Sequence, residues 1–344
     1  MNVAMWKKAL QVIPAVNKAE WDALDLVSKW LISSRAAVLI MTALPALLAG
    51  LFTLHDGLAV DGVAWFVLTL GLVLSHAMNN MVNDYTDFAR GVDVDNYFRT
   101  LYGPQPVADG LLTKRQHLFY ITVTGAAAIA CGVYLILING NDPVIWTLLG
   151  LGLFFVFFYT WPLKYIALGE VAVFIVWGPL MIGGGYYVLA HHWNANVIGA
   201  SLPYVLGVTT VIFGKHIDKL PADRAKKIFT LPALIGEKAA RFSILTMMFA
   251  PYLLVLVLIA LKYFTPVFLV VFLALPTTLR LSPLFFKPRP DTRPEGFPDG
   301  EGGWPLYFAP TAFENNRAFG VLFLGGLILD VALRLIPATA NFWR

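Results

Sequence analysis

The chain has 344 residues, of which 58% are hydrophobic and 13% are charged, and it carries a formal net charge of +4. Soluble globular domains have about 25% charged residues, so the composition excludes a soluble protein and predicts an integral membrane protein. The single cysteine, Cys131, excludes a disulfide framework and a cysteine-based metal site.

The first 34 residues form a mixed, amphipathic segment without the short apolar core of a cleavable signal peptide. Trp6, Trp21 and Trp30 predict a helix that lies on the cytoplasmic membrane surface with its apolar face down.

Nine later segments are long and apolar enough to cross a bilayer, which takes about 20 residues for a helix. We therefore expect an all-α bundle of about nine membrane helices in a single domain over 35–338. Residues 283–317 form a long cytoplasmic loop and 339–344 a short tail. The expected spans are 35–54, 60–82, 117–138, 144–162, 170–190, 197–217, 241–262, 264–282 and 318–337.

The basic residues fall almost entirely on one side of these spans. Of the 25 lysines and arginines, all but Lys262, Arg334 and Arg344 lie in the N-terminal segment or in alternate loops. The positive-inside rule then places the N-terminus in the cytoplasm and the C-terminus outside, as expected for an odd number of spans. Asp330 and Arg334, four residues apart in the last span, predict an internal ion pair.

The first acidic cluster, "NNMVNDYTDFARGVDVD" (79–95), follows directly on the second span. Asn83 and Asp87 are four residues apart and share a helix face, whereas Asp84 points about a quarter-turn away. Gly91 predicts the end of the helix, from which Asp93 folds back.

The second cluster lies at the end of the sixth span, on the same side, and contains Asp218 and Asp223. Five residues would splay these acids on one continuous helix. Pro221 between them predicts a break and a new helical turn, which lets Asp223 swing back beside Asp218.

Four carboxylates converging at a membrane interface need a cation, because two of them about 5 Å apart repel by roughly 3 kcal/mol. All the ligands offered are oxygen, which favours Mg²⁺ over Zn²⁺. The neighbouring cations Lys215, Lys219, Arg224, Lys226 and Lys227 suit the phosphate oxygens that would complete the Mg²⁺ shell.

These motifs resemble the UbiA superfamily of intramembrane prenyltransferases over residues 30–280. Asn83-Asp84-x-x-Asp87, with the next acid delayed to Asp93, is similar to the dihydroxynaphthoate-type (menaquinone-pathway) branch. "FYTWPLKYIALGE" (158–170) and "ADRAKKIFTLPALIG" resemble further segments of that family, with Asp223 as the matching acid. Lys219 stands where the family usually has an acid, so Asp218 has to substitute for it.

The resemblance implies nine helices that ring a central cavity and a polyprenyl diphosphate donor that two Mg²⁺ ions hold. The allylic cation formed on ionisation attacks an aromatic acceptor. Asp87, Asp223 and Asp218 are the expected catalytic residues, and the expected metal ligands are Asn83, Asp87, Asp93, Asp218 and Asp223. The expected diphosphate contacts are Arg35, Arg99, Tyr159, Lys164, Lys215, Lys219 and Arg224, with Asp84, Lys227 and His76 carrying less weight.

We expect membrane lipid as a further partner, no nucleic acid, and a bacterial or archaeal cytoplasmic membrane as the location. Three alternatives stay open: another phenolic acceptor, a lipid or sugar-phosphate acceptor, and an ion-coupled transporter. A transporter would place its acids near the bilayer midplane, whereas these lie at helix ends.

Overall fold

The computed structural model describes residues 2–91, 103–298 and 303–336. Within these ranges the regular structure is helical apart from one isolated bridge between Ile166 and Phe229. Among the described residues, eight helices are long and apolar enough to cross a membrane, and a ninth apolar helix, α8 (Pro143–Phe158), has 16 residues. The expected all-α membrane fold is therefore confirmed.

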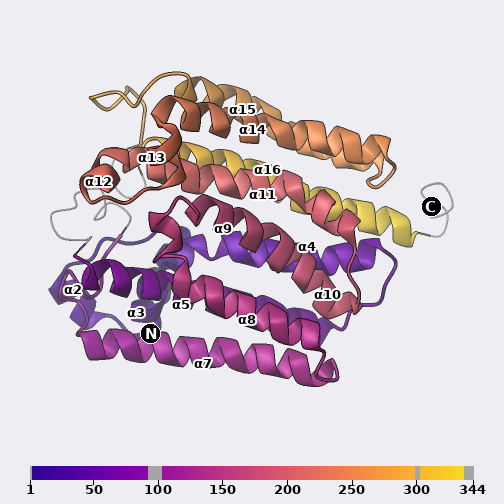
Figure 1. Ribbon diagram of the computed structural model, residues 1–344, viewed down its shortest axis with the longest axis horizontal. Helices are drawn as coiled ribbons and strands as arrows, with labels where there is room; N and C mark the ends of the chain where they lie inside the picture. Colours follow the sequence, from indigo (N-terminus) through magenta and orange to yellow (C-terminus); the bar gives the residue numbers. More distant parts are fainter. Residues whose placement is uncertain (1, 92–102, 299–302, 337–344) are drawn as a thin grey trace.

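The long helices run along the long axis of the molecule (Figure 1). They are α4 (Ile40–His55, preceded by η1, Ala36–Val38), α5 (Gly62–Ala89), α7 (Lys114–Ile138), α9–η3–α10 (Gly169–Ile175, Val176–Gly184, Gly185–Ala190), α11 (Ala195–Asp218), α14 (Glu237–Ala260), η4–α15–η5 (Pro266–Ala274, Leu275–Leu281, Ser282–Phe285) and α16 (Phe308–Leu335). Among the strongest pairings, α11 packs against α14 and α16, and α5 packs against α7.

Short helices gather at the end of the bundle where α5 and α11 finish (Figure 1). They are α1 (Val3–Gln11), α2 (Lys18–Ala23), α3 (Leu26–Ser33), η2 (Leu163–Tyr165), α12 (Leu220–Ala225) and α13 (Leu231–Ile235). This is the end that the basic loops predict to be cytoplasmic, and we call it the cytoplasmic end.

The N-terminal segment is three short helices, not the single surface helix expected from its three tryptophans. Pro14 and the helix-capping Asn17 lie between α1 and α2. Trp21 is 1% exposed because it packs against Leu111 and Leu112. Burying this indole against protein removes it from the expected role of a membrane anchor.

The fifth membrane segment contains a π-helix, η3, between α9 and α10. Pro179 lies inside it and cannot donate a backbone hydrogen bond, and Gly178 lets the backbone approach Val205 of α11 closely. The wide turns of η3 line the central cavity.

Helix α16 begins at Phe308, ten residues before the expected start of the last span. The polar stretch that suggested a loop is accommodated inside the bundle, since Asn315 accepts a hydrogen bond of 2.6 Å from Thr278 Oγ1. The expected long loop over 283–317 is correspondingly shorter, and η5 and α16 take both of its ends.

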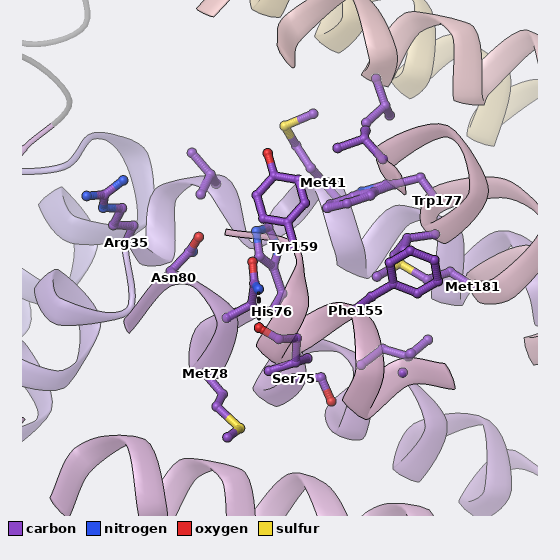
Figure 2. Close-up of a pocket in the computed structure, with 18 of the residues that line it drawn as sticks. Arg35, Met41, Ser75, His76, Met78, Asn80, Phe155, Tyr159, Trp177 and Met181 are labelled. Atoms are coloured by element: carbon purple, nitrogen blue, oxygen red, sulfur yellow. Dashed lines mark hydrogen bonds between the residues drawn. The ribbon is translucent and has the colours of Figure 1, made fainter. Parts of the chain in front are cut away.

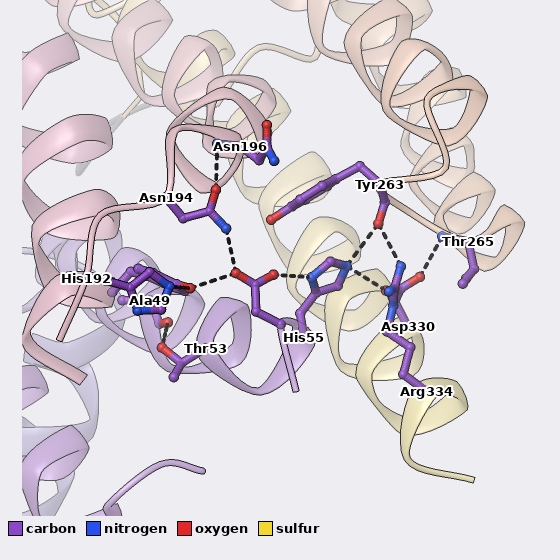
Figure 3. A network of polar contacts seen from close by, with 12 residues as sticks. Ala49, Thr53, His55, His192, Asn194, Asn196, Tyr263, Thr265, Asp330 and Arg334 are labelled. Carbon is purple, nitrogen blue, oxygen red and sulfur yellow. Dashed lines mark hydrogen bonds and ion pairs between the residues drawn. The ribbon is translucent and has the colours of Figure 1, made fainter. Parts of the chain in front are cut away.

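The end of the bundle opposite the cytoplasmic one is closed by a polar network (Figure 3). His55 lies between Asp56 (3.0 Å) and Asp330 (3.3 Å), and Arg334 Nε donates to Asp330 Oδ2 at 2.8 Å. Arg334 also donates to the Tyr263 carbonyl at 2.7 Å. The ion pair expected from the spacing of Asp330 and Arg334 is therefore confirmed, and His55 extends it to α4.

Candidate functional site

A cavity of about 690 Å³ lies between α4, α5, α7, α8 and η3 and reaches α11 and α16 at the cytoplasmic end. Most of its wall is apolar. Figure 2 shows Arg35 and Asn80 on one side, and Phe155, Trp177 and Met181 on the other. The cavity is therefore an apolar space with a polar rim on the side of the acidic motifs.

Polar groups at the rim are fixed by hydrogen bonds to the backbone or to neighbouring side chains. Asn79 Nδ2 donates to the Val156 carbonyl at 2.9 Å, and Asn80 Nδ2 donates to the Ser34 carbonyl at 2.8 Å. Tyr159 and Lys215, both expected to contact diphosphate, also line the cavity. The rim therefore offers donors and acceptors on α5, α8 and α11.

His76 faces the cavity one helical turn or more below this rim. Its Nδ1 lies 2.7 Å from Thr42 Oγ1, and its ring packs edge to face against Trp177 at 5.5 Å. The hydroxyl and the indole fix the ring orientation. His76 thus lines the cavity, in keeping with the minor site role expected for it.

The first acidic motif lies on the last two turns of α5, which ends at Ala89. Gly91 follows with φ +67, as expected for the residue that ends a helix. Asn83 Nδ2 donates to Thr160 Oγ1 at 2.9 Å, and Asp84 forms an ion pair with Arg35.

Asp87 is fully buried and forms an ion pair with Lys164. Lys164 Nζ lies 3.0 Å from Asp87 Oδ1 and 3.2 Å from Oδ2, and it is itself 7% exposed. A lysine buried to this degree needs a partner charge. The pair brings α5 and the segment before α9 together at the cytoplasmic end.

Tyr165, next to Lys164, lies between the two acidic motifs. Burial raises the pKa of its hydroxyl, and the negative charges of Asp87 and Asp223 raise it further. The Arg90 guanidinium lies 5.2 Å from the Tyr165 ring and 4.9 Å from the Trp161 ring. Tyr165 therefore stays neutral at pH 7 and can donate a hydrogen bond close to both acids.

The helix that carries the second acidic motif is interrupted at the position that Pro221 predicts. Helix α11 ends at Asp218, and α12 begins at Leu220 with Pro221 in its first turn. Asp223 on α12 is buried and lies 3.7 Å from Lys219 Nζ, an i,i+4 pair. Phe229 N donates to the Tyr165 carbonyl at 3.3 Å, which ties this motif to the segment that carries Lys164.

The Asp218 carboxylate is bound by the start of α16. Its oxygens accept backbone N–H groups at the start of α16, from Tyr307 (3.1 Å), Phe308 (3.0 Å) and Ala309 (2.9 Å). The first N–H groups of a helix have no partner within it, and a carboxylate satisfies them well. The expected metal-binding role of Asp218 beside Asp223 stays a prediction, and its carboxylate is held here by α16, which begins earlier than expected.

Glu170 and His216 form a buried pair that the sequence did not single out. Glu170 Oε1 contacts His216 Nδ1, and its two oxygens also accept the Leu231 N–H at 3.2 and 3.3 Å. The pair joins α9, α11 and α13 at the cytoplasmic end. Single residues of these types inside apolar segments carry no pattern from which this contact can be predicted.

The remaining expected residues fall outside the cavity or outside the described ranges. Arg224 and Lys227 are exposed on and after α12 and do not line the cavity. Asp93 and Arg99 lie in 92–102, beyond the residues that the structure describes. Glu314 and Arg317 of α16 line the cavity and were missed, since α16 was expected to begin after both.

The oxygen-rich site fits Mg²⁺ by its donor chemistry, although no three acidic, histidine or cysteine residues within the described ranges form a metal-binding group. Asp84, Asp87 and Asp223 each face a basic side chain, Arg35, Lys164 and Lys219 respectively. These ion pairs offset the repulsion between carboxylates that suggested a metal.

Comparison with known proteins matches residues 42–297 to the UbiA prenyltransferase family. The UbiA prenyltransferase domain-containing protein 1 homolog of Drosophila melanogaster is 28% identical over 242 residues, which cover 68% of this chain and 65% of that protein. The zebrafish (Danio rerio) UbiA prenyltransferase domain-containing protein 1 is 25% identical over 58% of this chain and 59% of its own length. The chain thus spans less than two thirds of these curated relatives.

Solved structures share the fold at low identity. A UbiA homolog from Archaeoglobus fulgidus bound to GPP and Mg²⁺ has a TM-score of 0.54 and 14% identity, covering 88% of this chain and 99% of that chain. A structure of digeranylgeranylglyceryl phosphate synthase has a TM-score of 0.52 and 13% identity over 95% of this chain and 99% of its own.

Proposed function

The chain belongs to the UbiA prenyltransferase family, and we propose that it transfers a prenyl group from a polyprenyl diphosphate to an aromatic acceptor inside the membrane. The observation that carries this proposal is the position of the buried Asp87–Lys164 pair, in the segments that close the polar end of an apolar cavity. Hydrocarbon and diphosphate need opposite environments, and this arrangement offers both within one site.

The donor class is supported by the related fold. The Archaeoglobus fulgidus homolog has been solved with GPP and with DMAPP, in both cases with Mg²⁺. In this chain Asn83, Asp87 and Asp223 would hold Mg²⁺, with Asp93 as the further acid of the first motif. The ion would supply Lewis-acid stabilisation of the leaving diphosphate. Asp218 is not part of this set, because it binds the start of α16.

The basic side chains would bind and orient the diphosphate. Arg35 and Lys215 line the cavity, and Lys164 lies behind its rim next to Asp87. Positioned cations stabilise the negative charge that develops on a leaving group. Lys164 would thus shift between Asp87 and a diphosphate oxygen, while Arg35 stays anchored on Asp84.

The bond changes balance without a redox partner. The allylic C–O bond breaks, and its electron pair leaves with the diphosphate. A ring carbon of the acceptor then forms a C–C bond with the allylic carbon and releases one proton. The apolar wall, with Met41, Phe155 and Trp177, excludes water that would convert the cation into an alcohol.

We favour a quinone-precursor acceptor of the dihydroxynaphthoate type, because the next acid of the first motif stands as late as Asp93. The His76 and Trp177 rings, packed edge to face, give the cavity an aromatic wall below its rim. A lipid acceptor is the second candidate, favoured by the fold shared with digeranylgeranylglyceryl phosphate synthase.

The experiment incubates purified protein in detergent with geranylgeranyl diphosphate, Mg²⁺ and one of three acceptors: 1,4-dihydroxy-2-naphthoate, 4-hydroxybenzoate or geranylgeranylglyceryl phosphate. Mass spectrometry of the products identifies the acceptor. A prenylated naphthoate supports the proposal in full. A prenylated glycerol lipid supports prenyl transfer but shows that the acceptor is a lipid and not an aromatic compound. Unchanged donor with every acceptor contradicts the proposed transfer.

A further inference from the structure

The central cavity has two parts, which different helices line. Helices α11 and α16 contribute only residues near the cytoplasmic end, from Val208 to Lys215 and from Ala309 to Arg317. Helices α5, α7, α8 and α10 continue to line it much deeper, down to Leu68 on α5. We call this deeper part the inner arm.

The depth of the cavity, from its rim to the floor of the inner arm, follows from the geometry of α5. Asn83 at the rim and Leu68 at the bottom both line the cavity and are 15 residues apart on the same helix, α5. An α-helix rises 1.5 Å per residue, so the cavity is about 22 Å deep from its rim to the floor of the inner arm, close to the extended length of roughly four isoprene units.

Small residues line this space, and two of them, Gly71 and Gly132, also let α5, α7 and α8 pack closely. Gly71 on α5, Ala128 and Gly132 on α7 and Gly152 on α8 all line the cavity. The hydroxyl of Ser75, a polar group in the arm, is satisfied by the Gly71 carbonyl at 2.8 Å. The arm therefore accepts hydrocarbon and offers a ligand little to hydrogen-bond.

Packed side chains close the bottom of the arm. Leu135, Ile145 and Val188 line the cavity there and are 5%, 4% and 5% exposed. They belong to one apolar cluster with Leu68 and the fully buried Ile136. A chain that reaches this floor cannot extend further without displacing a packed core.

We propose that the inner arm holds the prenyl tail of the donor and that its floor limits the tail to about four isoprene units. This proposal rests on the proposed function and adds the size of the donor to it. Leu135, Ile145 and Val188 are then the residues that determine chain-length specificity. A longer tail has to bend out sideways past Gly152, whose position is exposed, and loses apolar contacts inside the arm.

The test compares C10, C20 and C30 prenyl diphosphates as donors for one acceptor. We expect wild-type kcat/KM to be about tenfold higher for the C20 than for the C30 donor, the scale on which apolar pockets discriminate. Ile145→Ala deepens the floor and should bring this ratio close to one. Ile136→Ala removes the same atoms from the same cluster without opening the cavity, and it should leave the ratio unchanged.

A second pair of variants shortens the arm. Ala128→Phe places a ring in it and should lower kcat/KM for the C20 donor about tenfold relative to the C10 donor. Ala127→Phe adds the same ring at an exposed position of the same helix and should have no such effect.

Binding separates this inference from the proposed function. Thermal stabilisation of the protein by each diphosphate gives the length preference even without turnover. A preference for binding the C20 donor that is lost in Ile145→Ala but kept in Ile136→Ala supports the proposed length limit, even if no acceptor is prenylated. Equal turnover or equal stabilisation for C20 and C30, unchanged in Ile145→Ala, overturns the length limit while leaving prenyl transfer intact.

Discussion

At the scale of single residues, the ion pair of Asp87 and Lys164 has both a structural and a proposed chemical part. Both side chains are almost fully buried, so each neutralises a charge that would otherwise be costly in the bundle. The same lysine is a proposed ligand of the leaving diphosphate. The two contributions can be separated, because removing both charges should restore stability but not activity.

Lys164→Met leaves Asp87 buried without this partner, and we expect a loss of about 3–5 kcal/mol of stability together with activity. The double variant Asp87→Asn/Lys164→Met should recover most of the stability but none of the activity. Thermal unfolding in detergent and donor turnover measure the two effects. Recovery of turnover in the double variant would show that neither Asp87 nor Lys164 takes part in the chemistry.

The sequence predicted that the acidic motifs lie at one end of the bundle, and it missed several of the contacts made there. Asn83, Asp87 and Lys164 lie where their spacing and motifs placed them, at the cytoplasmic end of the bundle. Glu170, His216 and Thr160 were missed because their contacts join segments about 46 to 77 residues apart. A contact of that range leaves no periodic pattern in a single sequence.

At the scale of elements, the start of α16 decides what Asp218 does. The sequence predicted a helix break at Pro221 correctly, because proline acts locally. It could not predict that three N–H groups of a helix 90 residues later would take the carboxylate. The polar residues before 318 indicated a loop, and only the tertiary partners of Asn315 explain why they are helical.

Asp218→Asn should lower the stability by about 1–3 kcal/mol, since one carboxylate oxygen becomes an amide that cannot accept these bonds. Turnover per folded molecule and the Mg²⁺ concentration for half-maximal rate should stay close to wild type. Chemical unfolding and a Mg²⁺ titration of the rate measure them. A large rise in the Mg²⁺ requirement at unchanged stability would restore Asp218 as a metal ligand.

Gly214 permits the close contact between α11 and the start of α16. A Cβ there would lie 2.7 Å from the Phe308 carbonyl oxygen, so Gly214→Ala should cost about 1–3 kcal/mol. Gly199→Ala is the matched control on the same helix, with no atom within 4 Å of its Cβ, and should be neutral or slightly stabilising. Equal unfolding temperatures for the two variants would contradict this packing.

At the scale of the whole molecule, the two ends of the bundle are chemically different. The cytoplasmic end carries the acidic motifs and the basic loops, and the opposite end is closed by the network around His55 and Asp330 (Figure 3). The distribution of charge along the chain predicted that the two ends differ, because it depends only on loop composition. Which end faces the cytoplasm stays a prediction of the positive-inside rule. The cavity between the ends did not follow, since it depends on which helices pack together.

The opposite end predicts a pH dependence of stability. Burial favours the neutral form of Asp56, but hydrogen bonds from His55, Tyr186 and Asn194 outweigh it and lower the pKa of this carboxyl. Its contribution is therefore complete above about pH 5 and is lost as the pH falls through and below the ordinary value of about 3.9. The difference in unfolding temperature between wild type and Asp56→Asn should shrink over that range. A difference that stays constant from pH 6 to pH 3 would contradict this assignment.

The central claim is that the buried acids of the first motif act on a prenyl diphosphate. Its most direct test is Mg²⁺-dependent release of diphosphate from geranylgeranyl diphosphate, with the three acceptors present, in wild type, Asp87→Asn and Asp61→Asn. Asp61 caps the other end of the same helix α5, and asparagine caps helices nearly as well. We expect release by wild type and Asp61→Asn, abolished by chelating Mg²⁺, and at least a hundredfold slower release by Asp87→Asn. Equal release by the two variants, or release that does not depend on Mg²⁺, would contradict the account.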